Sequence, residues 1–214
     1  MVKRVSSPSG GGRTLSAGDW IRVATEALVE GGVGAVAVEP LALRLGATKG
    51  SFYHHFENRD ALVKAALDNW ERRQGEDVIA RLQLISDPRE RLRAVMVAAL
   101  TDHFGGLRDA ALLSSATDPL IKAAVARETE RRLRYLTETY AQTGLSKARA
   151  RRRALLYYTA YLGLFEYLRV GLEELTDAEL HAYALELVST LVPPGSQGAR
   201  RRLQQAPARR PRGS

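Results

Sequence analysis

One stretch near the N-terminus, residues 37–59, restricts what this chain can fold into more than any other part of it. Its sequence, AVEPLALRLGATKGSFYHHFENR, predicts two short helices joined by a tight turn. The first helix is expected over residues 38–45, with apolar residues on one face. Gly46 then ends it, because glycine enters the left-handed region without a Cβ penalty. Thr48 is a good N-cap for the second helix, since its hydroxyl can accept an N–H from the first turn.

The second helix of this stretch has an inner and an outer face. Phe52 and Phe56 fall four residues apart, so both are expected to point inward. The outer face carries one cation, two small residues and two hydrogen-bonding rings: Lys49, Gly50, Ser51, Tyr53 and His54. Small residues allow close approach to a partner. Such a face suits a helix that lies in the major groove of DNA.

The run LALRLGATKGSFYHHFENRDAL resembles the helix-turn-helix of the TetR family of bacterial transcriptional regulators. The residues that match the family pattern are Gly46, Tyr53, Phe56 and Arg59. The resemblance covers residues 14–74, and the rest of the chain matches only as an all-helical partner. One departure is Ala37, which stands where family members often carry a Thr or Ser that caps the first helix and touches a phosphate.

The resemblance implies a set of DNA contacts on and beside the second helix. The expected phosphate contacts are Lys49, Tyr53 and Arg59. The residues expected nearest the base edges are Gly50, Ser51 and His54, and Thr48 completes the predicted DNA-binding set. Phosphate contacts supply register and much of the affinity, whereas base contacts discriminate among sequences.

Composition excludes several other classes of protein. The chain has 214 residues, 45% of them hydrophobic, which is ordinary for a globular protein with a sizeable core. It has no cysteine, so disulfides and thiolate metal sites are excluded. No apolar run is long enough to span a membrane, and the N-terminus lacks the apolar core of a signal peptide. We therefore expect a cytoplasmic protein without a membrane partner. The net charge of +8 comes mostly from the arginines after residue 192, so charge alone is weak support for nucleic-acid binding.

Helical periodicity continues to residue 192 without a convincing strand, and predicts an all-α protein. Residues 1–13 form a basic leader expected to be disordered, either solvated or serving as an arm that reaches DNA. Residues 14–74 form the helix-turn-helix domain, with the motif at 37–56. Residues 75–192 form a helical effector-binding and dimerisation domain. Residues 193–214 form an Arg-rich tail, expected either to be free or to add non-specific phosphate attraction.

Helix boundaries follow from capping signals. A helix over 17–30 is opened by Ser16 and stopped by Gly31 and Gly32. A long helix follows Asn58 and runs to about residue 85, with a bend expected at Gly75. The later helices are predicted over 88–104 (broken by the glycines at 105–106), 107–115, 119–142, 147–170 and 177–192.

Little in the sequence favours catalysis. His54 and His55 are adjacent, so they point in different directions on a helix and cannot chelate one ion. We expect His54 to face DNA and His55 to pack inside the small domain. No nucleotide-binding or hydrolase motif occurs. The sequence predicts no enzyme activity, no cofactor and no metal site.

The helix over 147–170 is unusually aromatic. Its aromatic residues either fill the core or line a cavity for a small molecule. The candidate ligand-binding residues, with their neighbours in other helices, are Trp70, Phe104, Tyr135, Tyr157 and Tyr161. Small and apolar residues on the last two helices predict a partner surface, which the resemblance identifies as a dimer interface. Its candidate residues are Ala160, Gly163, Leu164, Leu187 and Leu191.

The combined prediction is a homodimeric regulator, most simply a repressor, that binds an inverted-repeat operator in double-stranded DNA and responds to a small-molecule effector. The alternative is a helical ligand-binding or protein-interaction module without specific DNA binding. The effector, the operator, the regulated genes and the sign of regulation are left open by the sequence.

Overall fold

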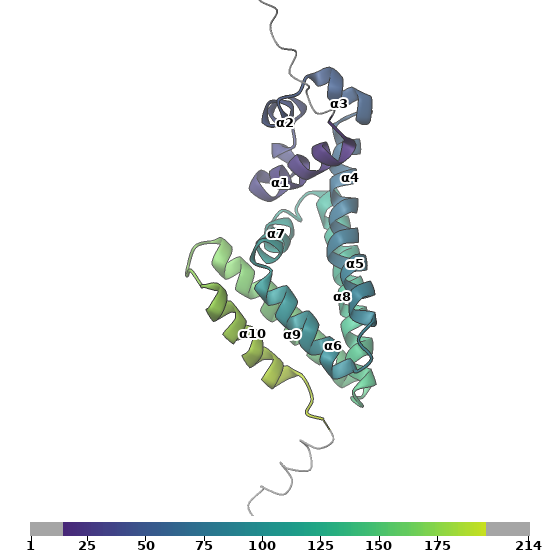
Figure 1. Ribbon diagram of the computed structural model, residues 1–214, viewed down its shortest axis with the longest axis vertical. Helices are drawn as coiled ribbons and strands as arrows, with labels where there is room; N and C mark the ends of the chain where they lie inside the picture. The colour runs from purple at the N-terminus through teal and green to yellow at the C-terminus, as the bar shows by residue number, and fades with distance from the viewer. Residues whose placement is uncertain (1–14, 196–214) are drawn as a thin grey trace, which may run out of the picture. The chain divides into compact units, whose positions relative to one another are not determined.

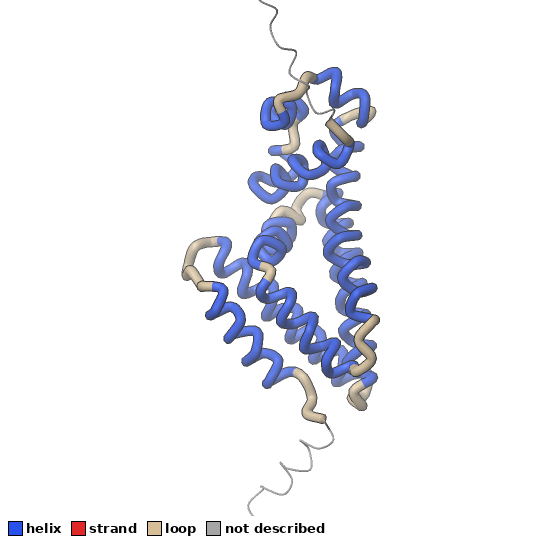
Figure 2. The backbone as a smooth tube through the Cα atoms, viewed as in Figure 1, coloured by secondary structure: helices blue, strands red, loops and turns tan. Residues whose placement is uncertain are grey.

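The computed structural model describes residues 15–195, apart from the side chain of Gln74. Within these residues it contains ten α-helices and one π-helical turn, and no strand (Figures 1 and 2). This confirms the all-α prediction. Among the described residues, each helix is too short or too polar to cross a lipid bilayer. The predicted leader lies outside the described residues, as does nearly all of the predicted tail.

The chain divides into two compact units between Asn69 and Trp70. The first unit contains α1 (Ala17–Ala35), α2 (Val38–Leu45), α3 (Lys49–His55) and most of α4 (Arg59–Glu71). Its core is apolar, and the rings of Trp20 and Phe52 meet edge to face at its centre, with centroids 5.3 Å apart. Phe52 is the residue by which α3 is anchored, and this leaves the opposite side of α3 exposed.

Local signals in this unit behave as the sequence predicts. Gly46 has a φ of 62° and ends α2 in the left-handed conformation. The Thr48 hydroxyl accepts the N–H of Ser51 at 3.3 Å. The side-chain oxygen of Asn58, Oδ1, accepts the N–H of Ala61 at 2.8 Å and so caps α4. Ala37 provides no side-chain cap to α2.

The end of α1 differs slightly from the prediction. The helix is assigned to Ala35, but Gly31 and Gly32 leave helical geometry, and Gly32 has a φ of 66°. The regular part therefore stops where the two glycines predicted, and one further turn follows the kink.

The second unit begins at Trp70 and holds the remaining elements. They are the π-helical turn η1 (Arg72–Glu76), α5 (Asp77–Gln83), α6 (Pro88–Thr101), α7 (His103–Ser114), α8 (Pro119–Gln142), α9 (Lys147–Arg169) and α10 (Asp177–Leu191). Both α7 and α8 pack on α9, and α10 packs on α6 (Figure 1). This π-helical turn lies where the sequence predicts a bend, at Gly75.

The prediction for residues 105–106 is wrong. Gly105 and Gly106 do not break a helix, because both lie in the first turn of α7. The break comes earlier at Asp102, whose carboxylate accepts the N–H of Gly105 at 3.0 Å. Glycine is needed at Gly106 for another reason. A Cβ there would overlap the buried ring of Phe165 on α9, so the glycine permits close packing of two helices.

Candidate nucleic-acid interface

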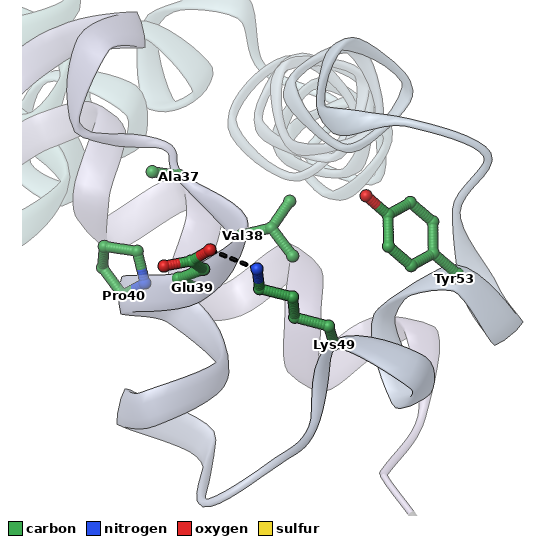
Figure 3. A pocket seen from close by; sticks show the side chains of 6 residues that line it. All are labelled: Ala37, Val38, Glu39, Pro40, Lys49 and Tyr53. Carbon is green, nitrogen blue, oxygen red and sulfur yellow. Dashed lines mark ion pairs between the residues drawn. The ribbon is translucent and has the colours of Figure 1, made fainter.

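The first unit contains a hollow of about 310 Å³ between the start of α2 and the outer face of α3. It is lined by Ala37, Val38, Glu39, Pro40, Lys49 and Tyr53 (Figure 3). We call it the α2–α3 hollow. The Tyr53 side chain is 62% exposed, and Figure 3 shows its hydroxyl extending toward the side of the hollow where Val38 lies. A hydroxyl, an ammonium group and the start of a helix therefore surround one small exposed space.

Glu39 on α2 forms an ion pair with Lys49 on α3 across this hollow (Figure 3). The hydrogen bond to Lys49 lowers the pKa of Glu39, and Glu39 in turn raises the pKa of Lys49. Both side chains are largely exposed, and exposed pairs contribute little to folding stability. This pair could not be predicted from helical spacing, because the two residues lie ten positions apart on different helices.

The remaining outward residues of α3 leave room for a partner. A Cβ on Gly50 would meet only the Thr48 hydroxyl, at an ordinary 3.6 Å. Tyr53 and His54 are exposed and Ser51 is half-buried. His55 turns inward, and its Nε2 lies 2.8 Å from the Leu15 carbonyl oxygen, as predicted for a packing residue. The face predicted from the spacing therefore exists.

Arg59 differs from the expected phosphate contact. Its Nε donates to the Val36 carbonyl at 2.7 Å, and its guanidinium also donates to the Val33 carbonyl. A third bond joins it to Asp60 at 3.1 Å. The guanidinium is therefore occupied by the connection between α1 and α2. Arg59 thereby positions the start of α2, where the α2–α3 hollow lies.

The second unit brings three of the five candidate ligand residues together. Trp70, Tyr157 and Tyr161 are all buried. The Trp70 Nε1 donates to one Asp109 carboxylate oxygen at 2.9 Å, and the Tyr161 hydroxyl donates to the other at 2.8 Å. The rings of Tyr157 and Tyr161 lie 6.5 Å apart. The aromatic residues thus form a core, and the polar atoms of Trp70 and Tyr161 converge on the Asp109 carboxylate. The sequence analysis did not identify Asp109.

Arg132 on α8 compensates the buried carboxylates. It donates to Asp109 at 2.5 Å and to Glu128 at 2.7 Å. Arg131 adds a bond to the second Glu128 oxygen at 2.9 Å. We call the set Trp70, Asp109, Glu128, Arg132 and Tyr161 the Asp109 network. It joins α4, α7, α8 and α9 through hydrogen bonds inside the second unit.

Burial shifts the pKa values of this network. It raises the pKa of Glu128, although Arg132 acts in the opposite direction. It also raises the pKa of Tyr161 well above the usual value, and the neighbouring Asp109 charge adds to this effect. Both shifts follow from desolvation, which disfavours the charged form of an acid.

The other two candidate ligand residues do not join this group. Phe104 is 84% exposed at the start of α7, so its predicted place in a cavity wall is wrong. Phe104, Gly105 and Gly106 all lie in the first turn of α7. Gly106 is the residue of that turn that faces Phe165 in the core, so Phe104, two positions earlier, points outward. Tyr135 is half-buried on α8 and makes no contact with the Asp109 network among the described bonds.

The candidate dimer residues fall into two groups. Gly163 is exposed, and Ala160, Leu164 and Leu187 are half-buried. Leu191 is buried in the core of its own subunit and offers no free surface, which corrects that assignment. Exposed apolar residues on α9 and at its C-cap escaped the sequence reasoning, among them Leu156 at 57%, Tyr167 at 42% and the C-cap residue Val170 at 52% exposure.

Comparison with known proteins shows which family model and which solved structures this chain resembles. Residues 21–66 match the family model described as bacterial regulatory proteins of the tetR family. A TetR-family transcriptional regulator from Agrobacterium tumefaciens shares the fold with a TM-score of 0.68 and 20% identity, over 83% of this chain and 97% of that one. No protein in a search of curated sequences matches.

Two further solved structures are similar over nearly their whole length. AibR in complex with isovaleryl coenzyme A and operator DNA has a TM-score of 0.65 and 22% identity, covering 84% of this chain and 99% of its own. Escherichia coli NemR has a TM-score of 0.68 and 16% identity, covering 84% of this chain and 98% of its own. At such identities the likeness concerns the fold.

The Asp109 network generates a stability prediction. Arg132→Met should lower the free energy of unfolding by about 3–5 kcal/mol, because it leaves two buried carboxylates without their shared cation. Arg134→Met on the same helix is the control, since Arg134 pairs with Glu130 at an exposed site, and there the change should stay within about 0.5 kcal/mol. Urea denaturation of both variants measures the difference.

The pH dependence of the Arg132 variant supplies a second measurement. Removing Arg132 raises the folded-state pKa of Glu128 further above its ordinary 4.5. A raised pKa in the folded state means that folding takes up a proton, so stability rises as the pH falls through that pKa. The Arg132→Met variant should regain stability from pH 7 toward pH 5 relative to wild type. An equal loss at both pH values would show that the carboxylates are not the cause.

Proposed function

We propose that this chain, whose residues 21–66 belong to the TetR family of bacterial regulatory proteins and whose fold is that of TetR-family transcriptional regulators, is a dimeric, ligand-responsive repressor acting in the cytoplasm. Its target is an inverted-repeat operator in double-stranded DNA. The observation that carries the proposal is the outer face of α3, which is exposed, small at Gly50 and bordered by Lys49 and Tyr53.

The proposed division of contacts follows from the position of each side chain. Lys49 and Tyr53 border the α2–α3 hollow, where a phosphate would find an ammonium group and a hydroxyl. Gly50, Ser51 and His54 are the candidates for base edges. Thr48 serves as the cap that starts α3, and Arg59 acts as a positioning residue through the carbonyls of Val33 and Val36.

The effector is proposed to act through α4. This helix runs from Arg59, which holds the start of α2, to Trp70, which donates to Asp109. A small molecule that binds more tightly to the second unit when the Asp109 network is rearranged would increase the population of molecules in which that network, and α4 with it, has moved. The structurally similar AibR was solved with isovaleryl coenzyme A and operator DNA together, which supports a small-molecule effector here.

The second proposed partner is another copy of this chain. Leu156, Gly163 and Tyr167 on α9 and Val170 at its C-cap are exposed and offer apolar side chains and a small residue to a partner. Exposed apolar patches of this kind mark interaction sites. Two reading helices related by two-fold symmetry require an inverted-repeat site, with half-sites one or more helical turns apart.

Genomic DNA captured by the purified protein, followed by sequencing and gel shift, tests the proposal. We expect one or more inverted repeats to bind at least about a thousandfold more tightly than random duplex. Equal affinity for all sequences would instead favour the alternative, a helical ligand-binding or interaction module without specific DNA binding.

The division between phosphate and base contacts generates a prediction about salt. Lys49→Ala should weaken binding to all operator variants alike and flatten the plot of log affinity against log salt by about one unit, because one phosphate contact is lost. His54→Ala should change the order of preference among operator variants. Gel shift across operator variants and salt concentrations measures both. An unchanged slope for Lys49→Ala would rule out its phosphate contact.

The ion pair across the α2–α3 hollow generates another prediction. Lys49 must leave Glu39 to reach a phosphate, and the carboxylate then lies near a like charge. Glu39→Gln should therefore raise affinity for any duplex, by about two- to fivefold, and more at low salt. Glu26→Gln on α1 is the matched control, since it removes the same charge from an exposed pair with Arg22. Equal gains in both variants would mean that only net charge matters.

A further inference from the structure

One end of the second unit gathers the ends of four helices. The Arg89 guanidinium at the start of α6 donates to the Thr143 carbonyl at the end of α8, at 3.0 Å. The next helix, α9, begins close by at Lys147. The Arg153 guanidinium on α9 donates to the Leu191 carbonyl at the end of α10, at 2.9 Å. The start of α6, the end of α8, the start of α9 and the end of α10 therefore lie together, in the lower part of Figure 1.

This end of the unit carries cations without an acidic partner. Four exposed cations occupy the first two turns of α9, and we call them the basic end: Lys147, Arg149, Arg151 and Arg152. Among the described residues, none of the four forms an ion pair. Cations at a helix N-terminus oppose the helix dipole, so their position is unfavourable for α9 itself. The sequence has no acid between Glu138 and Glu166, so the partner that would balance these charges lies outside this stretch.

The distribution of charge along the chain separates this end from the helix-turn-helix. Residues 15–69, the described part of the first unit, hold five Lys or Arg and seven Asp or Glu. The stretches that meet at the basic end, 87–93, 138–153 and 186–195, hold eight Lys or Arg and four Asp or Glu. Residues 196–214 continue the sequence from the last of these stretches and add six Arg without an acid. The basic excess therefore belongs to this end of the second unit and to the sequence that follows it.

We propose that the basic end binds the phosphate backbone of duplex DNA, independently of α3 and without regard to base sequence. Sequence-independent affinity for DNA comes from cations that neutralise phosphates and release counterions. The first unit has fewer cations than acids, and the two cations nearest α3 already have partners: Lys49 pairs with Glu39, and Arg59 donates to backbone carbonyls. This inference goes beyond the function proposed above, because it places a second DNA contact in the other unit.

The composition and arrangement of the basic end favour DNA over a membrane surface. Three of its four cations are Arg, whose planar guanidinium can donate two parallel hydrogen bonds to one phosphate. A helix that lies on a membrane carries its cations on one face and its apolar residues on the other. In an α-helix, Arg149 points about 160° away from Lys147 and Arg152 about 140° away from it. The cations therefore surround the start of α9 and form no single membrane-facing side.

Neutralising three of these cations tests the proposal in the full-length protein. The basic-end variant, Lys147→Gln with Arg149→Gln and Arg151→Gln, keeps Arg152, because Arg152 lies one turn before Leu156 of the proposed dimer surface. Fluorescence anisotropy measures its binding to a short duplex of random sequence across salt concentrations. We expect the plot of log affinity against log salt to flatten by about two to three units for each basic end that is bound, and the affinity at low salt to fall by about tenfold or more. An unchanged slope would overturn the proposal.

A matched variant removes the same charge elsewhere in the second unit. Arg73→Gln with Lys122→Gln and Arg134→Gln neutralises three exposed cations outside the basic end. We expect its salt slope to stay within about half a unit of the wild-type slope, because it removes no phosphate contact. Equal losses in the two triple variants would mean that net charge alone sets the affinity, which also overturns the proposal.

The folded state of the basic-end variant is checked separately. The variant should melt at the wild-type temperature or slightly above it, because it loses cations that oppose the α9 dipole. Circular dichroism measures the melting, and sedimentation measures the oligomeric state, which should be unchanged. The single variant Arg149→Gln carries the same test if the triple variant does not fold, with an expected flattening of about one unit per bound end.

Two other polyanions serve as probes of the partner's class. Wild type and the basic-end variant are compared on vesicles that contain phosphatidylglycerol and on poly-glutamate. Loss of either kind of binding in the variant, with an unchanged slope on random duplex, would overturn the proposal in favour of a lipid surface or an acidic protein. Preference for an inverted repeat over random duplex tests the function proposed above, so each of the two proposals can fail while the other stands.

Discussion

The second unit depends on one arrangement of buried charge, the pairing of Arg132 with Asp109 and Glu128. A carboxylate removed from water is costly unless it is paired and hydrogen-bonded. Asp109 meets that requirement by accepting from Trp70, Tyr161 and Arg132, which come from α4, α9 and α8. Apolar packing alone tolerates small slides of one helix over another, whereas these bonds are lost if any of the three moves. The network therefore fixes which residues of four helices face each other.

The first unit is organised by smaller and more local devices. Thr48 and Asn58 start α3 and α4, Gly46 ends α2, and Phe52 anchors α3 in the core. The caps and the helix end at Gly46 concern neighbours within a few residues, whereas Phe52 reaches the Trp20 ring in the core, and together they leave one face of α3 uncovered. Arg59 adds a longer reach, from the start of α4 back to the Val33 and Val36 carbonyls at the end of α1. The candidate DNA surface is the side of the motif that none of these contacts uses.

This contrast explains how much could be predicted from the sequence. Caps and helix ends are set by adjacent residues, so the starts of α6, α8 and α10 at residues 88, 119 and 177 were predicted correctly, and each is capped by the side chain of the residue before it. The outward face of α3 followed from helical spacing around Phe52. Contacts between distant residues left no such pattern. The Asp109–Arg132 pair, the Glu39–Lys49 pair and the inward turn of Arg59 were all missed, and Phe104 was misplaced because the glycines after it were read as a helix break.

The π-helical turn η1 has a geometrical consequence for the helices on either side. A π turn contains one residue more than an α-helix needs for the same advance. Trp70 and Leu82 are twelve positions apart, and in an unbroken α-helix they would point about 120° away from each other. One surplus residue brings them to within about 20°. Both are buried, so the turn containing Gly75 realigns the apolar faces of α4 and α5, and Gly75 itself leaves the space that the Glu128 carboxylate occupies.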